Sequence, residues 1–112
     1  MIRVRAPAKL NLYLRVLGKR PDGYHEIETV FERIDLADEL TFEPHPSEVW
    51  LTCTDLSTPP GRAQAGPPLS CGEDNLILNA ARLLQAASET RAGASIHLTK
   101  RIPVAAGLGG GS

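Results

Sequence analysis

The chain has 112 residues, enough for one domain with a modest hydrophobic core. Hydrophobic residues make up 42% of it and charged residues 22%, which is typical of a globular domain and excludes a disordered one. The formal net charge of −1 gives no electrostatic reason to expect a nucleic acid or an anionic membrane as the main partner.

Five segments of the first half are expected to form strands, because apolar and polar residues alternate or β-branched residues gather in them. They span residues 2–5, 10–16, 24–33, 39–43 and 49–54. The first is expected to stop at Ala6-Pro7, and a turn is expected over 18–23, where Pro21 fixes φ. The apolar positions predicted to face inward are Leu10, Leu12, Leu14, Val16, Leu40 and Phe42.

Residues 55–72 are predicted to form a long surface loop, because two Pro-Gly clusters leave no apolar period there. A helix is expected next, capped by Asp74 or Asn75 and stopped by Gly93. Its predicted apolar face consists of the residues that recur at helical spacing, namely Leu76, Ala80, Leu83, Leu84 and Ala87.

A final strand is predicted over residues 95–101, with Ile96 and Leu98 on the core side. The resulting order is β-β-β-β-β-α-β. It indicates an α+β fold, in which a helix covers one face of a mostly antiparallel sheet. We expect residues 1–112 to form a single domain without internal repeats.

The cysteines and the N-terminus indicate the compartment. Cys53 and Cys71 form no Cys-x-x-Cys motif and no cluster with zinc spacing, so no metal site is predicted. A disulfide stays open as an alternative, but we expect two free thiols of a reducing compartment. No apolar run approaches the length of a membrane span, and the alternating residues 1–5 lack the apolar core of a signal peptide. The expected location is the cytoplasm.

The last ten residues carry the strongest functional signal. They read Pro103-Val104-Ala105-Ala106-Gly107-Leu108-Gly109-Gly110-Gly111-Ser112. Glycine lets backbone amides approach a ligand closely and serine is a preferred helix N-cap, so the stretch predicts an anion site at a strand-to-helix turn. It is neither a Walker loop nor a dinucleotide-binding fingerprint. A flexible linker is the alternative, but Leu108 within the stretch and the strand before it favour the anion site.

Two further stretches carry weaker signals. Lys9 and Asn11 fall on one strand face, opposite the leucines, and are therefore candidates for substrate contact. Alone, they are more typical of a solvated strand face. Asp22-Gly23-Tyr24-His25 places an aromatic ring and an imidazole after a turn, where they can stack on and hydrogen-bond a flat ring. Alone, it is typical of a hairpin end.

Together, the three stretches resemble the GHMP small-molecule kinases. The motifs are Pro-Ala-Lys-x-Asn-Leu at 7–12, Asp-Gly-Tyr-His at 22–25 and Pro-x-x-x-Gly-Leu-Gly-Gly-Gly-Ser at 103–112. The resemblance runs from Ala6 to Ser112 and is weakest over 55–72. The motif at 22–25 indicates the branch that acts on a cytidyl diphosphate substrate. The fold implied is the family's N-terminal lobe, ribosomal protein S5 domain 2-like and incomplete here.

On the substrate side, the resemblance implies that Lys9 is the active-site lysine, near the substrate hydroxyl and the transferred phosphoryl group. A cation there would stabilise the developing negative charge. Asn11 matches the polar position beside it. Tyr24 and His25 match the residues that stack on and hydrogen-bond the cytosine ring.

On the nucleotide side, the resemblance implies ATP as co-substrate, accompanied by Mg²⁺. Residues 103–112 match the ATP phosphate loop, Asn75 and Leu76 match a helix start near the adenosine, and Lys100 lies at the nucleotide end. The family's aspartate, the helix after the loop and the second lobe have no counterpart in this sequence. We therefore expect the front part of a longer protein, inactive on its own, whose complete form transfers phosphoryl directly from ATP to a small-molecule hydroxyl.

Three other interpretations stay open. The substrate of another GHMP kinase would be homoserine, mevalonate or a sugar, which the motif at 22–25 disfavours. A non-catalytic, S5-like nucleic-acid-binding module is disfavoured by the near-neutral charge and the lack of a basic stripe. A structural or interaction role would show itself as folding without nucleotide binding. The sequence does not indicate whether the protein is a monomer or a homodimer.

Overall fold

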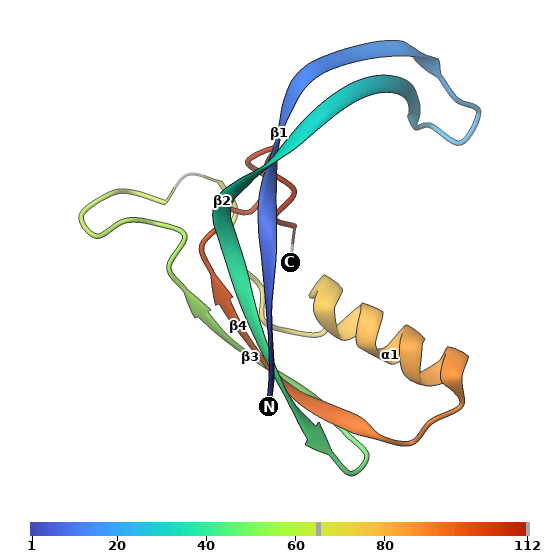
Figure 1. Cartoon of the computed structure of the whole chain (residues 1–112), viewed down its shortest axis with the longest axis vertical. Helices are drawn as coiled ribbons and strands as arrows, with labels where there is room; N and C mark the ends of the chain where they lie inside the picture. Colours follow the sequence, from blue (N-terminus) through green and yellow to red (C-terminus); the bar gives the residue numbers. More distant parts are fainter. Residues whose placement is uncertain (65, 112) are drawn as a thin grey trace.

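The computed structural model describes residues 1–64 and 66–111 (Figure 1). Its elements are β1 (Ile2–Lys19), β2 (His25–His45), β3 (Val49–Asp55), α1 (Leu76–Ser88) and β4 (Gly93–Lys100). The strands form one sheet in the order β1-β2-β4-β3. β1 pairs with β2 and β2 with β4 in antiparallel fashion, whereas β3 pairs with β4 in parallel. The predicted α+β class is confirmed, with a sheet that is mixed.

Two of the expected strand boundaries are wrong, because β1 and β2 are long continuous strands. β1 runs through Pro7, where we expected a break. Pro7 is accommodated because β1 is an edge strand and its pairing with β2 shifts register between Pro7 and Lys9. The strands expected separately over 24–33 and 39–43 are joined in β2. The strand over 49–54 is confirmed and extends by one residue to Asp55, and the described residues 56–64 and 66–72 form the predicted loop.

The outer parts of β1 and β2 form a two-stranded ribbon that curves away from the rest of the sheet (Figure 1). β4 pairs with β2 only over residues 39–45, so residues 25–33 of β2 pair with β1 alone. The expectation that the leucine stripe of β1 is half-buried is therefore wrong. Its side chains are 44–66% exposed, and they are Leu10, Leu12, Leu14 and Val16.

The core lies where β4 meets α1 and the start of the glycine-rich loop. Ile96 and Leu98 are 4% and 0% exposed, which confirms their prediction as core residues of the last strand. That strand begins at Gly93 and ends at Lys100, slightly earlier than expected. Leu40 and Phe42 are half-buried and line an apolar cavity of about 510 Å³ between α1 and the sheet.

Helix α1 begins as predicted and ends earlier. Asn75 caps it, because the side-chain oxygen of Asn75 accepts a hydrogen bond from the Ile77 amide at 2.9 Å. The C-cap is Glu89, in the left-handed region at φ 55°, so the prediction of Gly93 as the stop is wrong. Gly93 instead opens β4, where a Cβ would collide with the Glu48 backbone.

The apolar face predicted for α1 is also wrong. Leu83 and Leu84 are about 70% exposed, at 71% and 69%, and Leu76 is 57% exposed. Leu78 is the buried residue of the helix, and Ile77 is half-buried beside the sheet. All five predicted residues are exposed, although Ala80 and Leu84 line the cavity toward the sheet. Apolar residues surround the helix, so helical periodicity alone does not select the buried positions.

Cys53 of β3 and Cys71 of the long loop form a disulfide, so the expectation of free thiols is wrong. Their Cα atoms lie 6.1 Å apart because the loop returns to β3 before α1 begins. The two cysteines are 18 positions apart in the sequence, and nothing in the sequence pattern between them indicates that return. Of the helices that the structure describes, none is long and apolar enough to cross a membrane.

Candidate nucleotide and substrate site

The glycine-rich loop, residues 103–111 in the described part, folds back onto β1. The backbone amide of Lys9 donates a hydrogen bond to the carbonyl of Leu108 at 3.0 Å. The Lys9 ammonium donates to the carbonyl of Gly107 at 3.0 Å and to Asn11 Oδ1 at 2.6 Å. The structure thus brings together Lys9, Asn11 and the loop, three features that the sequence places at opposite ends of the chain.

Asn11 is held from both sides. Its Nδ2 donates to the hydroxyl of Thr29 at 2.9 Å, and that hydroxyl donates to the carbonyl of Tyr13 at 2.7 Å. Thr29 lies on β2, directly beside this part of β1. These bonds hold the side-chain amide of Asn11 with its oxygen toward Lys9. Asn11 therefore orients Lys9, and Thr29 in turn holds Asn11 in place.

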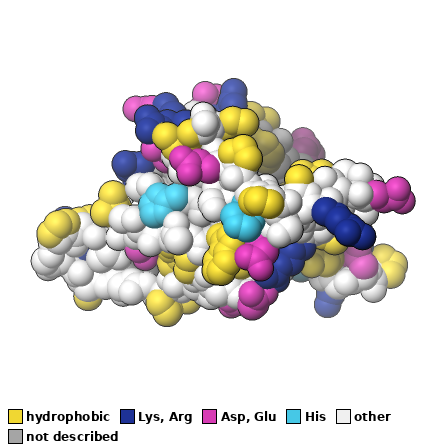
Figure 2. All heavy atoms as spheres, turned by 90° about the horizontal axis from the view of Figure 1, so that it is seen from below, with side chains coloured by type: hydrophobic (Ala, Val, Ile, Leu, Met, Phe, Trp, Pro, Cys, Tyr) yellow, Lys and Arg dark blue, Asp and Glu magenta, His cyan; other side chains and the backbone are white. Residues whose placement is uncertain are grey.

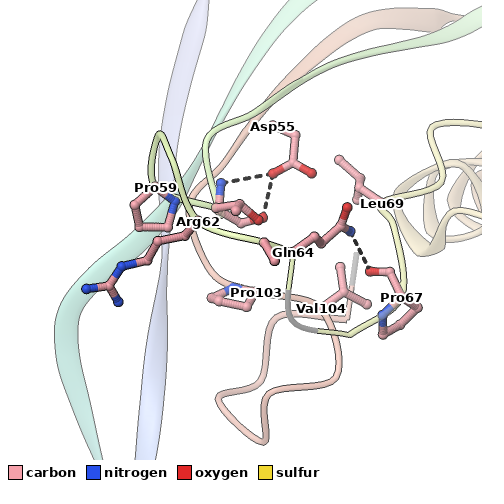
Figure 3. A pocket seen from close by; sticks show the side chains of 11 residues that line it. Asp55, Pro59, Arg62, Gln64, Pro67, Leu69, Pro103 and Val104 are labelled. Carbon is pink, nitrogen blue, oxygen red and sulfur yellow. Dashed lines mark hydrogen bonds between the residues drawn. The ribbon is translucent and has the colours of Figure 1, made fainter.

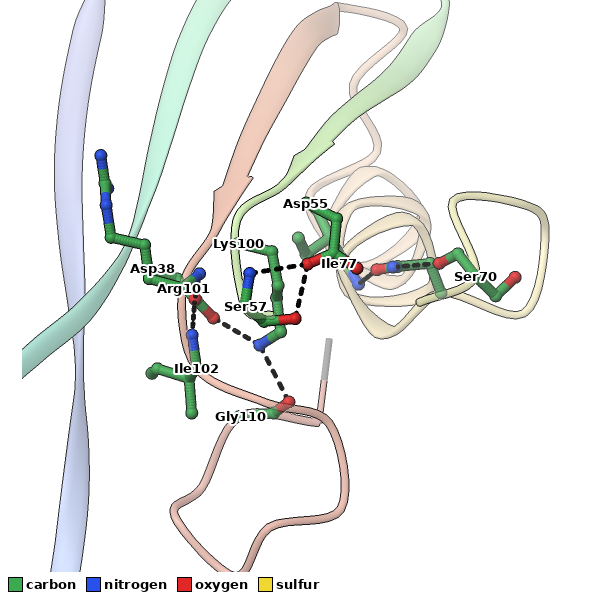
Figure 4. A network of polar contacts seen from close by, with 10 residues as sticks. Asp38, Asp55, Ser57, Ser70, Ile77, Lys100, Arg101, Ile102 and Gly110 are labelled. Atoms are coloured by element: carbon green, nitrogen blue, oxygen red, sulfur yellow. Dashed lines mark hydrogen bonds and ion pairs between the residues drawn. The ribbon is translucent and has the colours of Figure 1, made fainter. Parts of the chain in front are cut away.

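A second lysine anchors the other end of the loop (Figure 4). The Lys100 side chain is fully buried, and its ammonium donates to Asp38 Oδ2 at 2.6 Å and to the carbonyl of Gly110 at 2.9 Å. Asp38, which is 3% exposed, accepts two further hydrogen bonds at its Oδ1, from the amides of Arg101 and Ile102 at 2.7 and 2.9 Å. The network joins β2, the end of β4 and the loop.

These bonds orient the loop peptides. In a trans planar peptide, the carbonyl of one residue and the amide of the next point in opposite directions. Lys9 and Lys100 hold three loop carbonyls, so the amide that follows each carbonyl points away from the donor to that carbonyl. These amides belong to Leu108, Gly109 and Gly111. Amides turned outward in this manner are the donors that an anion site needs.

Two of the glycines are required by their surroundings. Gly109 adopts φ +81°, which favours glycine, and its α-carbon faces Lys9, whose Cγ would lie 3.5 Å from an added Cβ. At Gly110 an added Cβ would collide with the Ile102 side chain and lie 3.0 Å from Lys100 Nζ. The loop therefore lies tightly against both anchors.

The start of α1 borders the same loop. A Cβ added at Gly111 would lie 3.3 Å from Leu76 Cδ1, which places the end of the described loop against the first residue of the helix. Asn75 uses both ends of its amide internally, since its Oδ1 caps the helix and its Nδ2 donates to the Ser70 carbonyl at 2.7 Å. The predicted adenosine contact of Asn75 and Leu76 stays a prediction. Ser112, the last residue of the predicted phosphate loop, lies outside the described residues.

A cavity of about 280 Å³ adjoins the beginning of the loop (Figure 3). Pro103 and Val104 line one side of it and the Pro-rich loop lines the other, including Asp55 at the end of β3. The Ser57 hydroxyl and amide donate to the Asp55 carboxylate at 2.5 and 2.9 Å. These bonds, with a smaller contribution from the charge of Lys100, hold the pKa of Asp55 below its ordinary value.

Tyr24 and His25 lie at the tip of the β1–β2 ribbon, and the structure does not bring them to the glycine-rich loop. His25 pairs with Lys19, ten residues beyond Lys9 along β1. That separation corresponds to about 33 Å of extended strand. The turn itself is well formed, because the Tyr24 amide donates to Asp22 Oδ1 at 3.0 Å. Tyr24 is 69% exposed, so its ring is open to solvent.

Sequence analysis missed Asp38, the residue that accepts three hydrogen bonds beside the loop. One signal was present, namely an acidic residue that follows Leu36-Ala37 inside a strand. Thr29, which holds Asn11, carried no signal that distinguished it from other strand threonines. Within residues 1–64 and 66–111, no group of three or more His, Cys, Asp or Glu side chains could hold a metal ion.

Known proteins match this chain over nearly its whole length. The 4-diphosphocytidyl-2-C-methyl-D-erythritol kinase of a Synechococcus strain is 53% identical over 114 residues, which is 100% of this chain and 34% of that protein. The kinase of the same name from Salinibacter ruber is 51% identical over 107 residues, which is 96% of this chain and 34% of that protein.

The crystal structure of 4-(cytidine 5'-diphospho)-2C-methyl-D-erythritol kinase matches this fold with a TM-score of 0.71 at 41% identity. The match covers 98% of this chain and 35% of the chain in the crystal structure. The GHMP kinases N terminal domain matches residues 75–112, from the cap of α1 through the glycine-rich loop. This chain is similar to the GHMP kinases in sequence and in fold. The chain spans only about a third of the length of the curated kinases that it matches, 34% for the first two.

Proposed function

We propose that the protein to which this chain belongs transfers a phosphoryl group from ATP to a hydroxyl of 4-diphosphocytidyl-2-C-methyl-D-erythritol. This reaction belongs to the non-mevalonate route to isoprenoid precursors. The main support is the contact between Lys9 and the glycine-rich loop, because the Lys9 ammonium lies 3.0 Å from the Gly107 carbonyl. A lysine held there places a positive charge at the edge of the proposed phosphate site.

In the proposed reaction, the substrate hydroxyl oxygen forms a bond to the γ-phosphorus of ATP while the bond from that phosphorus to the ADP oxygen breaks, and the hydroxyl proton is released to water. Catalysis of this transfer consists of positioning and charge stabilisation, without a covalent enzyme intermediate. Lys9 stabilises the charge on the transferred group, and Asn11 orients Lys9 through their 2.6 Å hydrogen bond. The outward amides of Leu108, Gly109 and Gly111 hold the phosphates, beside Asn75 and Leu76.

The ribbon tip is proposed to bind the cytidyl end of the substrate. Tyr24 offers an exposed ring for stacking and His25 offers an imidazole for hydrogen bonding. Since His25 pairs with Lys19 at the far end of β1, this assignment requires the curved ribbon (Figure 1) to bring its tip, through space, within the length of one cytidyl diphosphate substrate bound at Lys9.

The remaining parts of the proposal concern cofactor, lobe and location. The residues at the loop do not fit a protein-held metal: Asp38 is engaged with Lys100 and two amides. Mg²⁺ would therefore be bound by the phosphates of ATP and by water, and no step is assigned to it.

We propose a ribosomal protein S5-like lobe in a cytoplasmic protein without a nucleic-acid or membrane partner. Basic and acidic side chains are intermingled on the face seen in Figure 2, with no continuous basic stripe there.

A substrate panel tests the proposal. The purified full-length protein is supplied with ATP, Mg²⁺ and one acceptor at a time, and ADP release is measured. The acceptors are the cytidyl erythritol compound, homoserine, mevalonate and galactose. We expect ADP release with the cytidyl compound alone. Equal or faster turnover with another acceptor contradicts the proposed substrate, and ATP binding without turnover on any acceptor contradicts the proposed reaction.

A further inference from the structure

Asp38 and Lys100 form a fully buried ion pair that chain stability alone does not explain. Their exposed fractions are 3% and 0%, and the Nζ–Oδ2 distance is 2.6 Å. Removing two charges from water is costly, and apolar residues of similar volume often stabilise a fold as well as a buried pair does. A buried pair is retained more readily where its directional hydrogen bonds fix a particular arrangement, so its other partners indicate what it fixes.

Those partners hold the Lys100 ammonium group in one position. Asp38 comes from β2 and is held by the amides of Arg101 and Ile102, which bond to its other oxygen. The carboxylate therefore stays in place and holds Lys100 on its remaining oxygen. A further N–H of Lys100 donates to the carbonyl of Gly110 at 2.9 Å. This hydrogen bond fixes the carbonyl side of the peptide group between Gly110 and Gly111.

The orientation of that peptide determines where the Gly111 amide points. Since carbonyl and amide are opposed in a trans peptide, a carbonyl held on Lys100 turns the Gly111 amide away from the buried pair. Gly110 permits this close approach, because a Cβ there would lie 3.0 Å from Lys100 Nζ. The pair also neutralises itself, so its effect on a bound phosphate depends on geometry more than on net charge.

We propose that Asp38 and Lys100 are positioning residues that aim the Gly111 amide at a phosphate of the bound nucleotide without touching the nucleotide. The inference rests on the proposed function, since it requires residues 103–111 to be the phosphate loop. Lys100 then acts on ATP through Gly110, and Asp38 acts through Lys100.

The test is the double variant Asp38→Asn/Lys100→Met in the full-length protein. Asparagine keeps an oxygen for the Arg101 and Ile102 amides, and methionine fills the volume of the lysine while releasing the Gly110 carbonyl. Binding of ATP and of adenosine is measured by calorimetry, together with the thermal midpoint. We expect ATP to bind about tenfold to a hundredfold more weakly, the loss of one hydrogen bond to a charged group, and adenosine to bind as before.

The outcomes separate this inference from the proposed function. No ATP binding by the wild-type protein contradicts the function itself. Wild-type binding with unchanged ATP affinity in the double variant overturns the positioning role, and so does an equal loss for ATP and adenosine. Arg5→Ala, which breaks an exposed ion pair with Asp35, is the matched control and should change neither affinity.

A second measurement needs no variant. In wild-type protein labelled with ¹⁵N-glycine, saturating ATP with Mg²⁺ should shift the amide resonance of Gly111 strongly and that of Gly18, in the ribbon, hardly at all. A Gly111 resonance that does not respond to the nucleotide overturns the inference, whatever the double variant does.

Discussion

The glycine-rich loop and the tip of the β1–β2 ribbon are proposed to bind the two reactants, yet they are built in opposite ways. The loop has no regular secondary structure, but hydrogen bonds from Lys9 and Lys100 hold three of its carbonyls. The ribbon tip is regular, but it rests on pairing between two strands alone. Its leucines are largely exposed.

The difference teaches that regular structure and fixed position are separate properties. An irregular segment is held rigidly where buried donors meet its carbonyls, as they do around Gly110. A two-stranded ribbon without a third layer is marginal on its own, since neither face is covered. We therefore expect the loop to respond sharply to small changes and the ribbon to tolerate them.

The largest expected effect is at Lys9. Lys9→Ala should lower kcat about 100-fold to 1000-fold, the usual cost of one donor to developing charge. ATP affinity should change little, because the loop retains its Lys100 anchor. Steady-state kinetics and calorimetry measure the two quantities. Arg3→Ala, on the same strand, is the control. An unchanged kcat would mean that Lys9 is only a solvated strand residue.

The same substitution in both regions gives the sharpest comparison. Gly110→Ala should weaken ATP binding about tenfold or more, because its Cβ would meet Ile102 and Lys100 in a packed site. Gly18→Ala, in the ribbon, should leave the affinity as it is, since no atom lies within 4 Å of the added Cβ. Equal effects of the two variants, measured by ATP titration, would remove the distinction between the regions.

A third prediction concerns the ribbon tip. Tyr24→Ala should raise KM for the cytidyl substrate about tenfold, the loss of one base-stacking contact, and leave the KM for ATP unchanged. His25→Ala should remove the preference for cytidine diphosphate over uridine diphosphate as a competitive inhibitor. If the wild-type protein is inhibited equally by both, the tip does not distinguish the bases.

The smallest expected effect is a pH dependence at Asp55. Its folded-state pKa is lowered, so its stabilising contribution is present above the unfolded value of about 3.8 and is lost as the pH falls through the folded value. Because the group is largely exposed, the contribution is under about 1 kcal/mol. Thermal midpoints of wild type and Asp55→Asn should differ at neutral pH and converge as the pH falls below the folded-state pKa of Asp55. Parallel curves over the whole range would contradict this assignment.

The sequence predicted most reliably what depends on neighbours along the chain. The cap at Asn75, the strand over 49–54, the core positions Ile96 and Leu98 and the shared face of Lys9 and Asn11 each follow from local chemistry or period. The contact of Lys9 with the loop was expected only through family resemblance. It joins residues 98 positions apart, which no periodicity encodes.

The failures share a cause, because each depends on what another segment does. The leucines of β1 have the alternation of a buried strand but face no covering layer. The face of α1 was misassigned because apolar residues surround the helix. Asp38 became visible only when β4 supplied Lys100 and the two residues after β4 supplied their amides. The Cys53–Cys71 disulfide required the return path of a loop that has no period of its own.

Because the pairing of β1 shifts register, the number of residues around Lys9 matters as much for its position as their types do. The pairing of β1 with β2 slips between Pro7 and Lys9 and again between Asn11 and Tyr13, so Lys9 and Asn11 lie in a short frame between two slips. Inserting or deleting one residue within 9–11 would turn the lysine to the opposite face of the sheet, even if the other residues stayed the same. Residues 56–64 and 66–70 lie outside the sheet, and loops of this kind absorb length changes at a small cost in free energy. Natural variation in length is therefore expected in that loop and not in the frame around Lys9.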